Sequence, residues 1–345
     1  MNTSTHYLGL HLNSPIVIGA CSLTQRPEMV RELSIAGAGA VVLPSLFEEQ
    51  IVHQMMDQGK EPSPSETRIE AACYAESEDS YNGGPNEYLS NIRQLKSVTA
   101  IPVIANLNGC TDGHWLDFSR EIEQAGADAL ELSLDSEVAD SACSADEVES
   151  RLLESVTDVC DMVNIPVSVK LTPFHTNLSN LSWRLLEAGA SGVVCFAHEP
   201  AWHVATEQIA ATLNWGLTPA SNINSTIAGL VRVRANGPDF SVAASGGISV
   251  PQDLIKTIIA GADVSMVTSE VYRAGPDAVA HLLDGLSCYL QRHGFMSFQE
   301  FVASRPSSGH AIRRMQVSSL TRCQEFIDPT PGMQHQSGDR WGHMH

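Results

Sequence analysis

The sequence has no pair of cysteines at CxxC spacing, although eight cysteines are scattered along its 345 residues. Such a pattern is typical of reduced thiols in a cytosolic protein and excludes an obvious iron–sulfur or zinc motif. The histidines near the C-terminus, His335, His343 and His345, lie in a Ser/Pro/Gly-rich stretch that is typical of a frayed tail. We therefore predict no metal site.

Basic residues are also scarce. The chain has 20 Lys and Arg against 40 Asp and Glu, a formal net charge of −20, which argues against a nucleic acid or an anionic membrane as partner. It lacks any apolar run of 18 residues and any basic region followed by an apolar segment at the N-terminus. Only 17% of residues are charged and 43% are hydrophobic. We expect a soluble cytoplasmic protein with a large buried core.

The tripeptide Ala-Gly-Ala occurs four times, each time at the end of a helical pattern and before a short β-rich run. Glycine at this position caps a helix, and its small neighbours let the chain turn tightly into the next strand. Prolines mark the start of the other strands, where no ladder hydrogen bond is needed. The two signals predict eight strands: 15–20, 40–44, 102–107, 129–134, 166–171, 192–196, 240–244 and 264–268.

Strands that alternate with helical stretches and read as continuous apolar runs are typical of a parallel sheet buried on both faces. Eight of them favour an α/β fold of the closed (β/α)8 TIM barrel type, and an open doubly wound sheet is the alternative. Long loops follow strands 2 and 6, at residues 45–86 and 197–225, where they can cover a ligand. We expect the barrel to occupy residues 1–302 and an irregular C-terminal tail to occupy 303–345.

The stretch from Ser241 to Pro276 combines two features that suit a phosphate group. Gly246 and Gly247 follow one strand, and Thr268 and Ser269 follow the next. Paired glycines expose backbone N–H groups, and the hydroxyls add two O–H donors. In a (β/α)8 barrel the loops after strands 7 and 8 are the usual phosphate site. The sequence therefore predicts a phosphorylated ligand.

Lys170 is the most specific single residue at a predicted strand end, because it interrupts an otherwise apolar run. Its charge is cheaply satisfied only at the barrel mouth. It can stand beside an anionic cofactor or act as a Schiff-base nucleophile, and the alternative is an ion pair with Glu131 on the adjacent strand. Weaker candidates for nucleophiles or acid–base groups are Cys21, Cys195, Asp135, Ser136, His175 and His198.

Five motifs carry a family resemblance: SLFEEQ at 45–50, PVIANLNG at 102–109, AGADALEL at 125–132, VKL at 169–171 and ASGGI at 244–248. With them the chain resembles the dihydroorotate dehydrogenase family of FMN-dependent (β/α)8 barrels. Within it, the chain is most similar to the branch called dihydroorotate dehydrogenase-like proteins. The likeness runs from Tyr7 to Pro276, with a weaker continuation to Phe301.

The resemblance implies that the barrel binds FMN. Ala20 and Cys21 would lie against the isoalloxazine ring, and Asn106 would hydrogen-bond the flavin. Lys170 would lie near flavin N1 and O2, where a cation stabilises the anionic reduced ring and raises its reduction potential. The other positions that the resemblance assigns to the cofactor are Ser45, Ser133, Gly246, Gly247, Thr268 and Ser269.

The motifs around the substrate depart from the family pattern. The family run Asn-Leu-Ser-Cys-Pro-Asn corresponds to Ser133–Val138 here, which puts Ser136 at the position of the proton-abstracting base. The substrate-binding asparagine after strand 6 is replaced by Phe196-Ala197-His198, and the lysine after strand 2 by Pro44-Ser45. Sites built to hydrogen-bond a polar substrate discriminate strongly. We therefore predict that dihydroorotate is not the substrate.

The resemblance implies an FMN-dependent oxidoreductase acting on CH–CH groups of a small, pyrimidine-like substrate, by hydride transfer involving flavin N5. Ser136 and Lys170 would be its catalytic residues. One alternative is a barrel that has lost catalysis and serves as a flavin-binding or assembly partner. Another is an aldolase that forms a Schiff base through Lys170 with a sugar phosphate. A homodimer is the default expectation for such a barrel.

Overall fold

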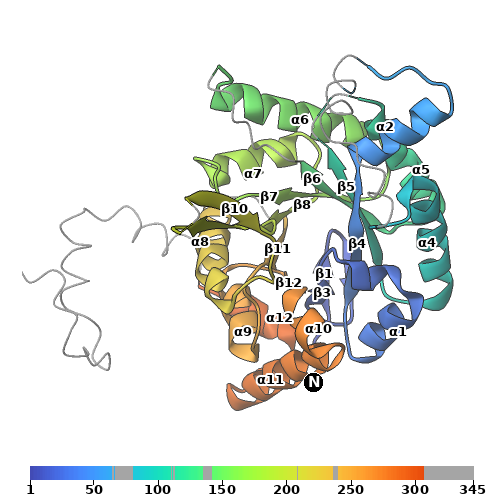
Figure 1. The fold of residues 1–345 in the computed structure, drawn as a ribbon. Helices are drawn as coiled ribbons and strands as arrows, with labels where there is room; N and C mark the ends of the chain where they lie inside the picture. The colour runs from blue at the N-terminus through green and yellow to red at the C-terminus, as the bar shows by residue number, and fades with distance from the viewer. Residues whose placement is uncertain are drawn as a thin grey trace, which may run out of the picture.

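Eight parallel strands close into a barrel in the computed structural model, which describes residues 1–63, 66, 81–109, 111, 113–134, 142–207, 209–235 and 240–306. The strands follow one another around the barrel in chain order, and the last lies beside the first (Figure 1). The predicted (β/α)8 barrel and its eight strands are thus confirmed. The barrel strands are β3 (Ile16–Ile18), β4 (Ala40–Phe47), β5 (Val103–Gly109), β6 (Ala129–Leu134), β7 (Val167–Leu171), β8 (Gly192–Cys195), β11 (Ser241–Ser245) and β12 (Val264–Val267).

Helices surround the barrel on its outer side (Figure 1). Those between the strands are α1 (Pro27–Ile35), α2 (Glu48–Asp57), α4 (Gly84–Val98), α5 (Phe118–Ala125), α6 (Ala145–Met162), α7 (Leu178–Glu187), α8 (Ile223–Val233) and α9 (Pro251–Ala260). Three more follow the last strand: α10 (Ser269–Ala274), α11 (Asp277–Arg292) and α12 (Phe298–Ala303). No helix in the described part of the chain is both long enough and apolar enough to cross a bilayer.

The four Ala-Gly-Ala glycines act as predicted. Gly37, Gly126, Gly189 and Gly261 have φ values between 101° and 123°, a region that residues with a side chain rarely adopt. Each follows a helix, so the glycine reverses the chain from the helix toward the next strand.

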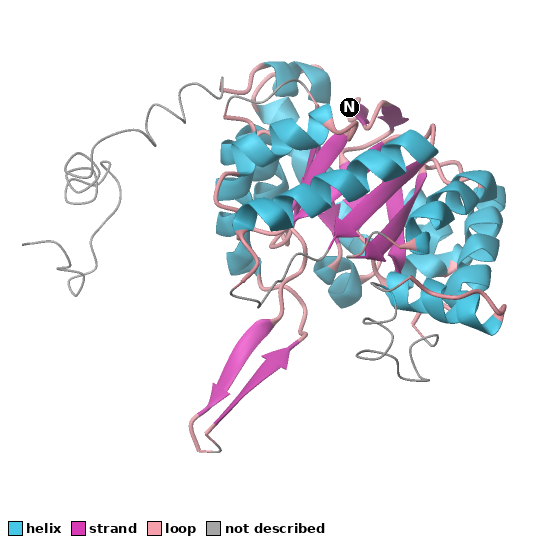
Figure 2. Cartoon of the chain, turned by 90° about the horizontal axis from the view of Figure 1, so that it is seen from above, coloured by secondary structure: helices cyan, strands magenta, loops and turns pink. Residues whose placement is uncertain are grey.

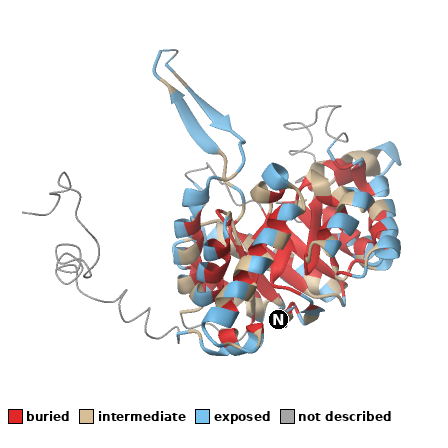
Figure 3. Ribbon diagram, turned by 90° about the horizontal axis from the view of Figure 1, so that it is seen from below, coloured by how far each residue is buried: buried red, intermediate tan, exposed pale blue. Residues whose placement is uncertain are grey.

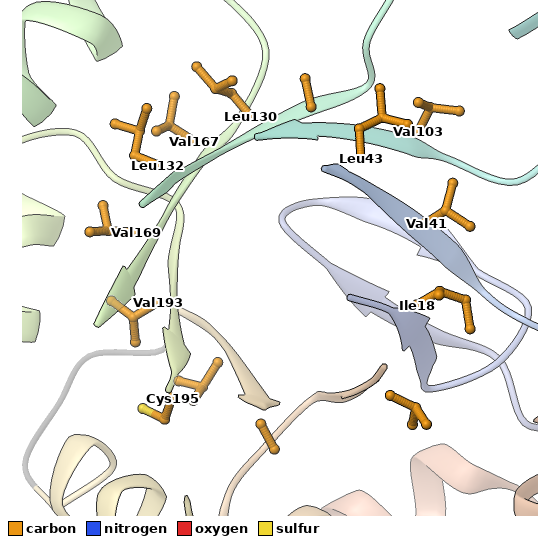
Figure 4. Packing of buried hydrophobic residues seen from close by; sticks show 14 of the residues in the cluster. Ile18, Val41, Leu43, Val103, Leu130, Leu132, Val167, Val169, Val193 and Cys195 are labelled. Atoms are coloured by element: carbon orange, nitrogen blue, oxygen red, sulfur yellow. The ribbon is translucent and has the colours of Figure 1, made fainter. Parts of the chain in front are cut away.

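Side chains alternate along each barrel strand between the helix layer and the barrel interior. Figure 4 shows one set, including Leu130, Leu132, Val169 and Cys195, which belongs to the large apolar cluster shared with the helices. The interior set forms a second, smaller cluster that includes Val194 and Met266. By the same alternation, polar residues of the interior set point toward the barrel axis.

A short hairpin packs into the amino-terminal end of the barrel. Its strands are β1 (Thr5–Tyr7) and β2 (Leu10–Leu12), and they pair in antiparallel fashion. Tyr7, Leu8 and Leu12 are at most 3% exposed and pack with the interior cluster. The amino-terminal end of the barrel is therefore filled by side chains.

A second hairpin interrupts the loop after the sixth barrel strand. Its strands are β9 (Ala201–Ala205) and β10 (Ala210–Asn214), and Figures 2 and 3 show it projecting away from the barrel. The segment predicted as the loop after the second strand, residues 45–86, contains the last residues of β4, all of α2 and the start of α4. Residues 64–65 and 67–80 of this segment lie outside the described residues. Residues 307–345 of the predicted tail also lie outside them.

Candidate functional site

A cavity of about 490 Å³ opens at the carboxyl ends of the barrel strands. Residues at or just beyond the ends of β3, β7, β8, β11 and β12 form its wall, together with the loop after the β9–β10 hairpin. Segments far apart in the sequence therefore meet at one place. Seven of the residues predicted to contact the cofactor line it: Ala20, Cys21, Lys170, Gly246, Gly247, Thr268 and Ser269.

The glycine turn after β11 lies directly against the beginning of helix α8. Gly246 and Gly247 have φ values of 105° and 78°. A β-carbon on Gly247 would collide with the backbone nitrogen of Ile223, the first residue of α8. The Ile223 N–H donates to the Ala220 carbonyl of the preceding 3-10 turn, while the positive end of the α8 dipole at this position attracts anions. This end of the cavity is therefore suited to a phosphate.

Hydrogen bonds fix the loops around this end. The Thr226 hydroxyl contacts both the Ser245 and the Gly246 carbonyl oxygens at 3.0 Å, and the hydroxyl hydrogen is its only donor. The Thr218 N–H donates to Ser269 Oγ at 2.9 Å, and Arg273 Nη2 donates to the Thr218 carbonyl at 3.0 Å. The loop after the projecting hairpin is thus tied to both ends of α10, whose Arg273 lines the cavity.

Lys170, on another part of the cavity wall, belongs to a buried ion pair. Lys170 Nζ contacts Glu131 Oε1, and the two side chains are 12% and 0% exposed. The same carboxylate oxygen accepts from Asn106 Nδ2 at 2.6 Å, and that Nδ2 also lies 3.1 Å from Ser133 Oγ. The predicted alternative for Lys170, an ion pair with Glu131, is therefore present. It coexists with the position of Lys170 on the cavity wall.

Two polar atoms of this network are left over. Asn106 Oδ1 and Glu131 Oε2 are buried and have no hydrogen-bond partner among the described residues. Unsatisfied buried acceptors cost about 1–3 kcal/mol each. The network, which reaches the cavity wall through Lys170, is thus incomplete with the described protein residues alone.

Three residues predicted to contact the cofactor, Ser45, Asn106 and Ser133, are absent from the described cavity wall. Ser45 lies beside Asn106 in the β4–β5 register, and its carbonyl accepts from Asn82 Nδ2 at 2.8 Å. Ser136, the predicted base, lies outside the described residues, as does Asp135. The roles predicted for Ser45 and Ser136 stay predictions.

Sequence reasoning missed the aromatic residues at the cavity mouth, among them Tyr81, Trp215 and Tyr272. His198, predicted as a weaker candidate, also lines the cavity, and its Nδ1 lies 2.9 Å from Thr218 Oγ1. Burial lowers the pKa of His198, against a smaller opposite effect of a hydrogen bond with the Gly216 backbone. Apart from Tyr272, which lies in helix α10, these residues come from loops, whose spatial positions no periodic pattern indicates.

The cysteine candidates are poor nucleophiles. Cys195 faces the helix layer and is fully buried, and burial raises its pKa to about 12. Burial also raises the pKa of Cys21, which lines the cavity. Both remain neutral thiols near pH 7, and thiolates are the reactive form. His175, whose pKa burial lowers, is absent from the described cavity wall.

Comparisons with known proteins place this geometry in a family. The catalytic subunit of dihydroorotate dehydrogenase B (NAD(+)) from Methanosarcina acetivorans is 26% identical over 85% of this chain and 93% of its own length. The corresponding subunit from Pyrococcus furiosus is 24% identical over 88% of this chain and 98% of its own. The NAD-dependent dihydropyrimidine dehydrogenase subunit PreA of Escherichia coli K12 is 26% identical over 63% of this chain and 56% of its own.

The family model described as dihydroorotate dehydrogenase matches residues 4–290, which span the whole barrel from the β1–β2 hairpin nearly to the end of α11. The match covers the strand ends that line the cavity, including Lys170 and the glycine turn after β11. The chain therefore belongs to the dihydroorotate dehydrogenase family, a family of oxidoreductases.

Proposed function

We propose that the cavity binds FMN and that the protein is an FMN-dependent oxidoreductase. The observation that carries this proposal is that two unlike features line one cavity. The first is the glycine turn against the start of α8, and the second is Lys170 with its buried polar network. A volume of about 490 Å³ lies within the range of ordinary cofactor pockets.

Different residues of the chain would bind the phosphate and the ring of the cofactor. Backbone N–H groups at Gly246, Gly247 and the start of α8 would hold the phosphate, with the hydroxyls of Thr268 and Ser269 beside them. The unpaired Asn106 Oδ1 would accept from the flavin ring. When bound, FMN supplies the capacity to accept and release a hydride.

Lys170 would place a cation beside the ring, and Glu131 would hold that cation in position. A positive charge near the ring favours its anionic reduced form. Because Lys170 contributes its ammonium to the pair with Glu131, the arrangement favours this role over that of a Schiff-base amine.

The substrate we propose is small and pyrimidine-like, and it differs from dihydroorotate. Curated relatives carry the names dihydroorotate dehydrogenase and dihydropyrimidine dehydrogenase. At the position of the family's substrate asparagine this chain has Phe196, which is 6% exposed and packs against Gly229 of α8. An apolar ring cannot replace the amide's hydrogen bonds, and that loss discriminates against a substrate that needs them. Ser136 remains our candidate base.

A visible spectrum of the purified protein tests the cofactor. We expect flavin absorption, or FMN binding on titration of the apoprotein, and weaker binding in the Gly247→Ala variant. Absence of both absorption and binding would refute the proposal. Anaerobic mixing with a panel of dihydropyrimidines then tests catalysis through bleaching of the flavin band.

The second candidate is a barrel that binds flavin without catalysis. The departures from the family pattern at Ser133 and at Phe196-Ala197-His198 favour it. Bleaching by any compound of the panel excludes this candidate. This candidate is supported if dithionite bleaches the flavin band and no compound of the panel changes it.

A further inference from the structure

Two histidines face each other on the outer side of the β1–β2 hairpin. His6 lies opposite His11 in the antiparallel register, and their ring centroids are 5.4 Å apart. Both residues are exposed, whereas Thr5, Tyr7 and Leu12 of the same strands are buried. Because side chains alternate along a strand, the hairpin packs one face into the barrel and presents the histidine pair on the other.

The backbone of the hairpin holds the two histidines in this register. Only Leu8 and Gly9 separate the two strands, and both have positive φ values, 53° and 75°, as a two-residue type I′ turn requires. The Leu8 N–H donates to Ser241 Oγ of β11 at 2.8 Å, and Leu8 is 3% exposed. The turn is thus anchored to the barrel, and the strands cannot slip without removing Tyr7 from the core.

The position of the pair relative to the turn brings the two imidazoles close together. The residues that flank a two-residue turn form a hydrogen-bonded pair, and here they are Tyr7 and Leu10. Since hydrogen-bonded and non-hydrogen-bonded pairs alternate along an antiparallel ladder, His6 and His11 form a non-hydrogen-bonded pair. Side chains approach most closely at such positions, where β-carbons lie about 4.5–5.5 Å apart.

The separation of the rings matches that of two ligands on one metal ion. Zinc binds imidazole nitrogen at about 2.0–2.1 Å in tetrahedral geometry, which places the centroids of two ligating rings about 5 Å apart. The 5.4 Å between the rings of His6 and His11 is close to that value, so rotation of the side chains alone can aim one nitrogen of each at a shared ion. The formal net charge of −20 adds a general attraction for cations.

We propose that His6 and His11 form a binding site for a zinc-like divalent transition-metal ion on the outer face of the hairpin. Imidazole is a preferred ligand of such ions. In the described part of the chain no group of three or more His, Cys, Asp or Glu side chains could hold a metal, so water would complete the coordination of the ion. The sequence prediction of no metal site rested on cysteine spacing and on the terminal histidines, whereas this pair arises from strand register.

A bound ion would cross-link the two strands that close the amino-terminal end of the barrel. The hairpin holds the two imidazoles together only when the chain is folded, so the ion binds the native state in preference to the unfolded one. Such binding stabilises the fold by mass action. At a free zinc concentration one hundred times the dissociation constant, the folding equilibrium constant should rise by about a hundredfold.

Urea unfolding of the full chain at pH 7.5, with and without Zn²⁺, tests the site. We expect zinc to stabilise the wild type, and we expect His6→Gln and His11→Gln each to lose at least about nine-tenths of the increase in the folding equilibrium constant. His203→Gln is the matched control, because His203 is an exposed strand histidine of the β9–β10 hairpin that is paired with Thr212. This variant should respond to zinc as the wild type does.

Circular dichroism verifies that each variant is folded, and calorimetric titration of the native proteins with Zn²⁺ should show one site fewer in each variant of the pair. Loss of the zinc effect in both His6→Gln and His11→Gln, with retention in His203→Gln, supports the site. A wild type that zinc does not stabilise overturns the proposal. A zinc effect that persists in either variant of the pair, or that is also lost in His203→Gln, overturns it as well, because the ion is then not held by the two histidines together.

Discussion

Replacing Lys170 with methionine separates the structural role of this lysine from its proposed role beside a cofactor. Methionine keeps most of the side-chain volume and removes the ammonium. Glu131 is then left 0% exposed with no cation beside it. Its Oε1 retains the hydrogen bond from Asn106 Nδ2 at 2.6 Å, while Oε2 still has no partner among the described residues.

The expected cost is large for one substitution. Removing one partner of a buried ion pair typically costs about 3–5 kcal/mol, because the remaining charge is uncompensated. The retained Asn106 bond puts the expected loss near the lower end, about 3 kcal/mol. Adding Glu131→Gln to Lys170→Met removes the stranded charge, so the double variant should recover at least half of the loss.

Urea unfolding of the apoprotein, followed by fluorescence and circular dichroism, measures the loss of stability. The FMN reduction potential measures the effect of the lost cation on the cofactor. It should fall in both Lys170→Met and the double variant, since both lack the cation. Wild-type stability in Lys170→Met would refute the buried-pair argument, and so would a double variant no more stable than the single one.

Three further predictions concern the same cavity and its surroundings. Gly247→Ala should weaken FMN binding at least about tenfold, and more than Gly246→Ala, because only the former collides with the backbone of α8; equal titration curves would contradict this. Iodoacetamide at pH 8 should label exposed Cys288 and leave Cys195, whose pKa is raised to about 12, unlabelled until denaturant is added. Peptide mapping measures the labelling, and modification of Cys195 before Cys288 would contradict this prediction. Because burial lowers the pKa of His198, the stability it contributes should be lost as the pH falls below 6.5; an NMR titration midpoint above 6.5 would refute this.

The barrel and the phosphate end of the site were predictable because both depend on local chemistry. Gly261 and its three counterparts need a positive φ after a helix, which the repeated Ala-Gly-Ala tripeptide signals directly. Gly246 and Gly247 stand next to a strand end in the sequence itself. Lys170 was conspicuous because a charge interrupts an apolar run, and the predicted strand order placed Glu131 on the adjacent strand.

The features that sequence reasoning missed depend on tertiary context. The β9–β10 strands alternate in polarity, but their turn, around Glu207 and Ile209, lacks the Asn-Gly or Asp-Gly signal of a hairpin. The strands of the β1–β2 hairpin are only three residues long, too short for a period to emerge. Tyr81 reaches the cavity from a loop and Tyr272 from helix α10, and only the closed barrel brings them together.

The packing of Tyr7, Leu8 and Leu12 closes the amino-terminal end of the barrel, so the cavity formed by the described residues opens toward the carboxyl ends of the strands. In an oxidoreductase with such a cavity, the electron donor and the electron acceptor that enter from this side use the same entrance. Each must leave before the other can reach the same face of a buried ring. Initial-rate kinetics would then give parallel double-reciprocal lines, the pattern of a double-displacement cycle, for every acceptor that approaches through the mouth.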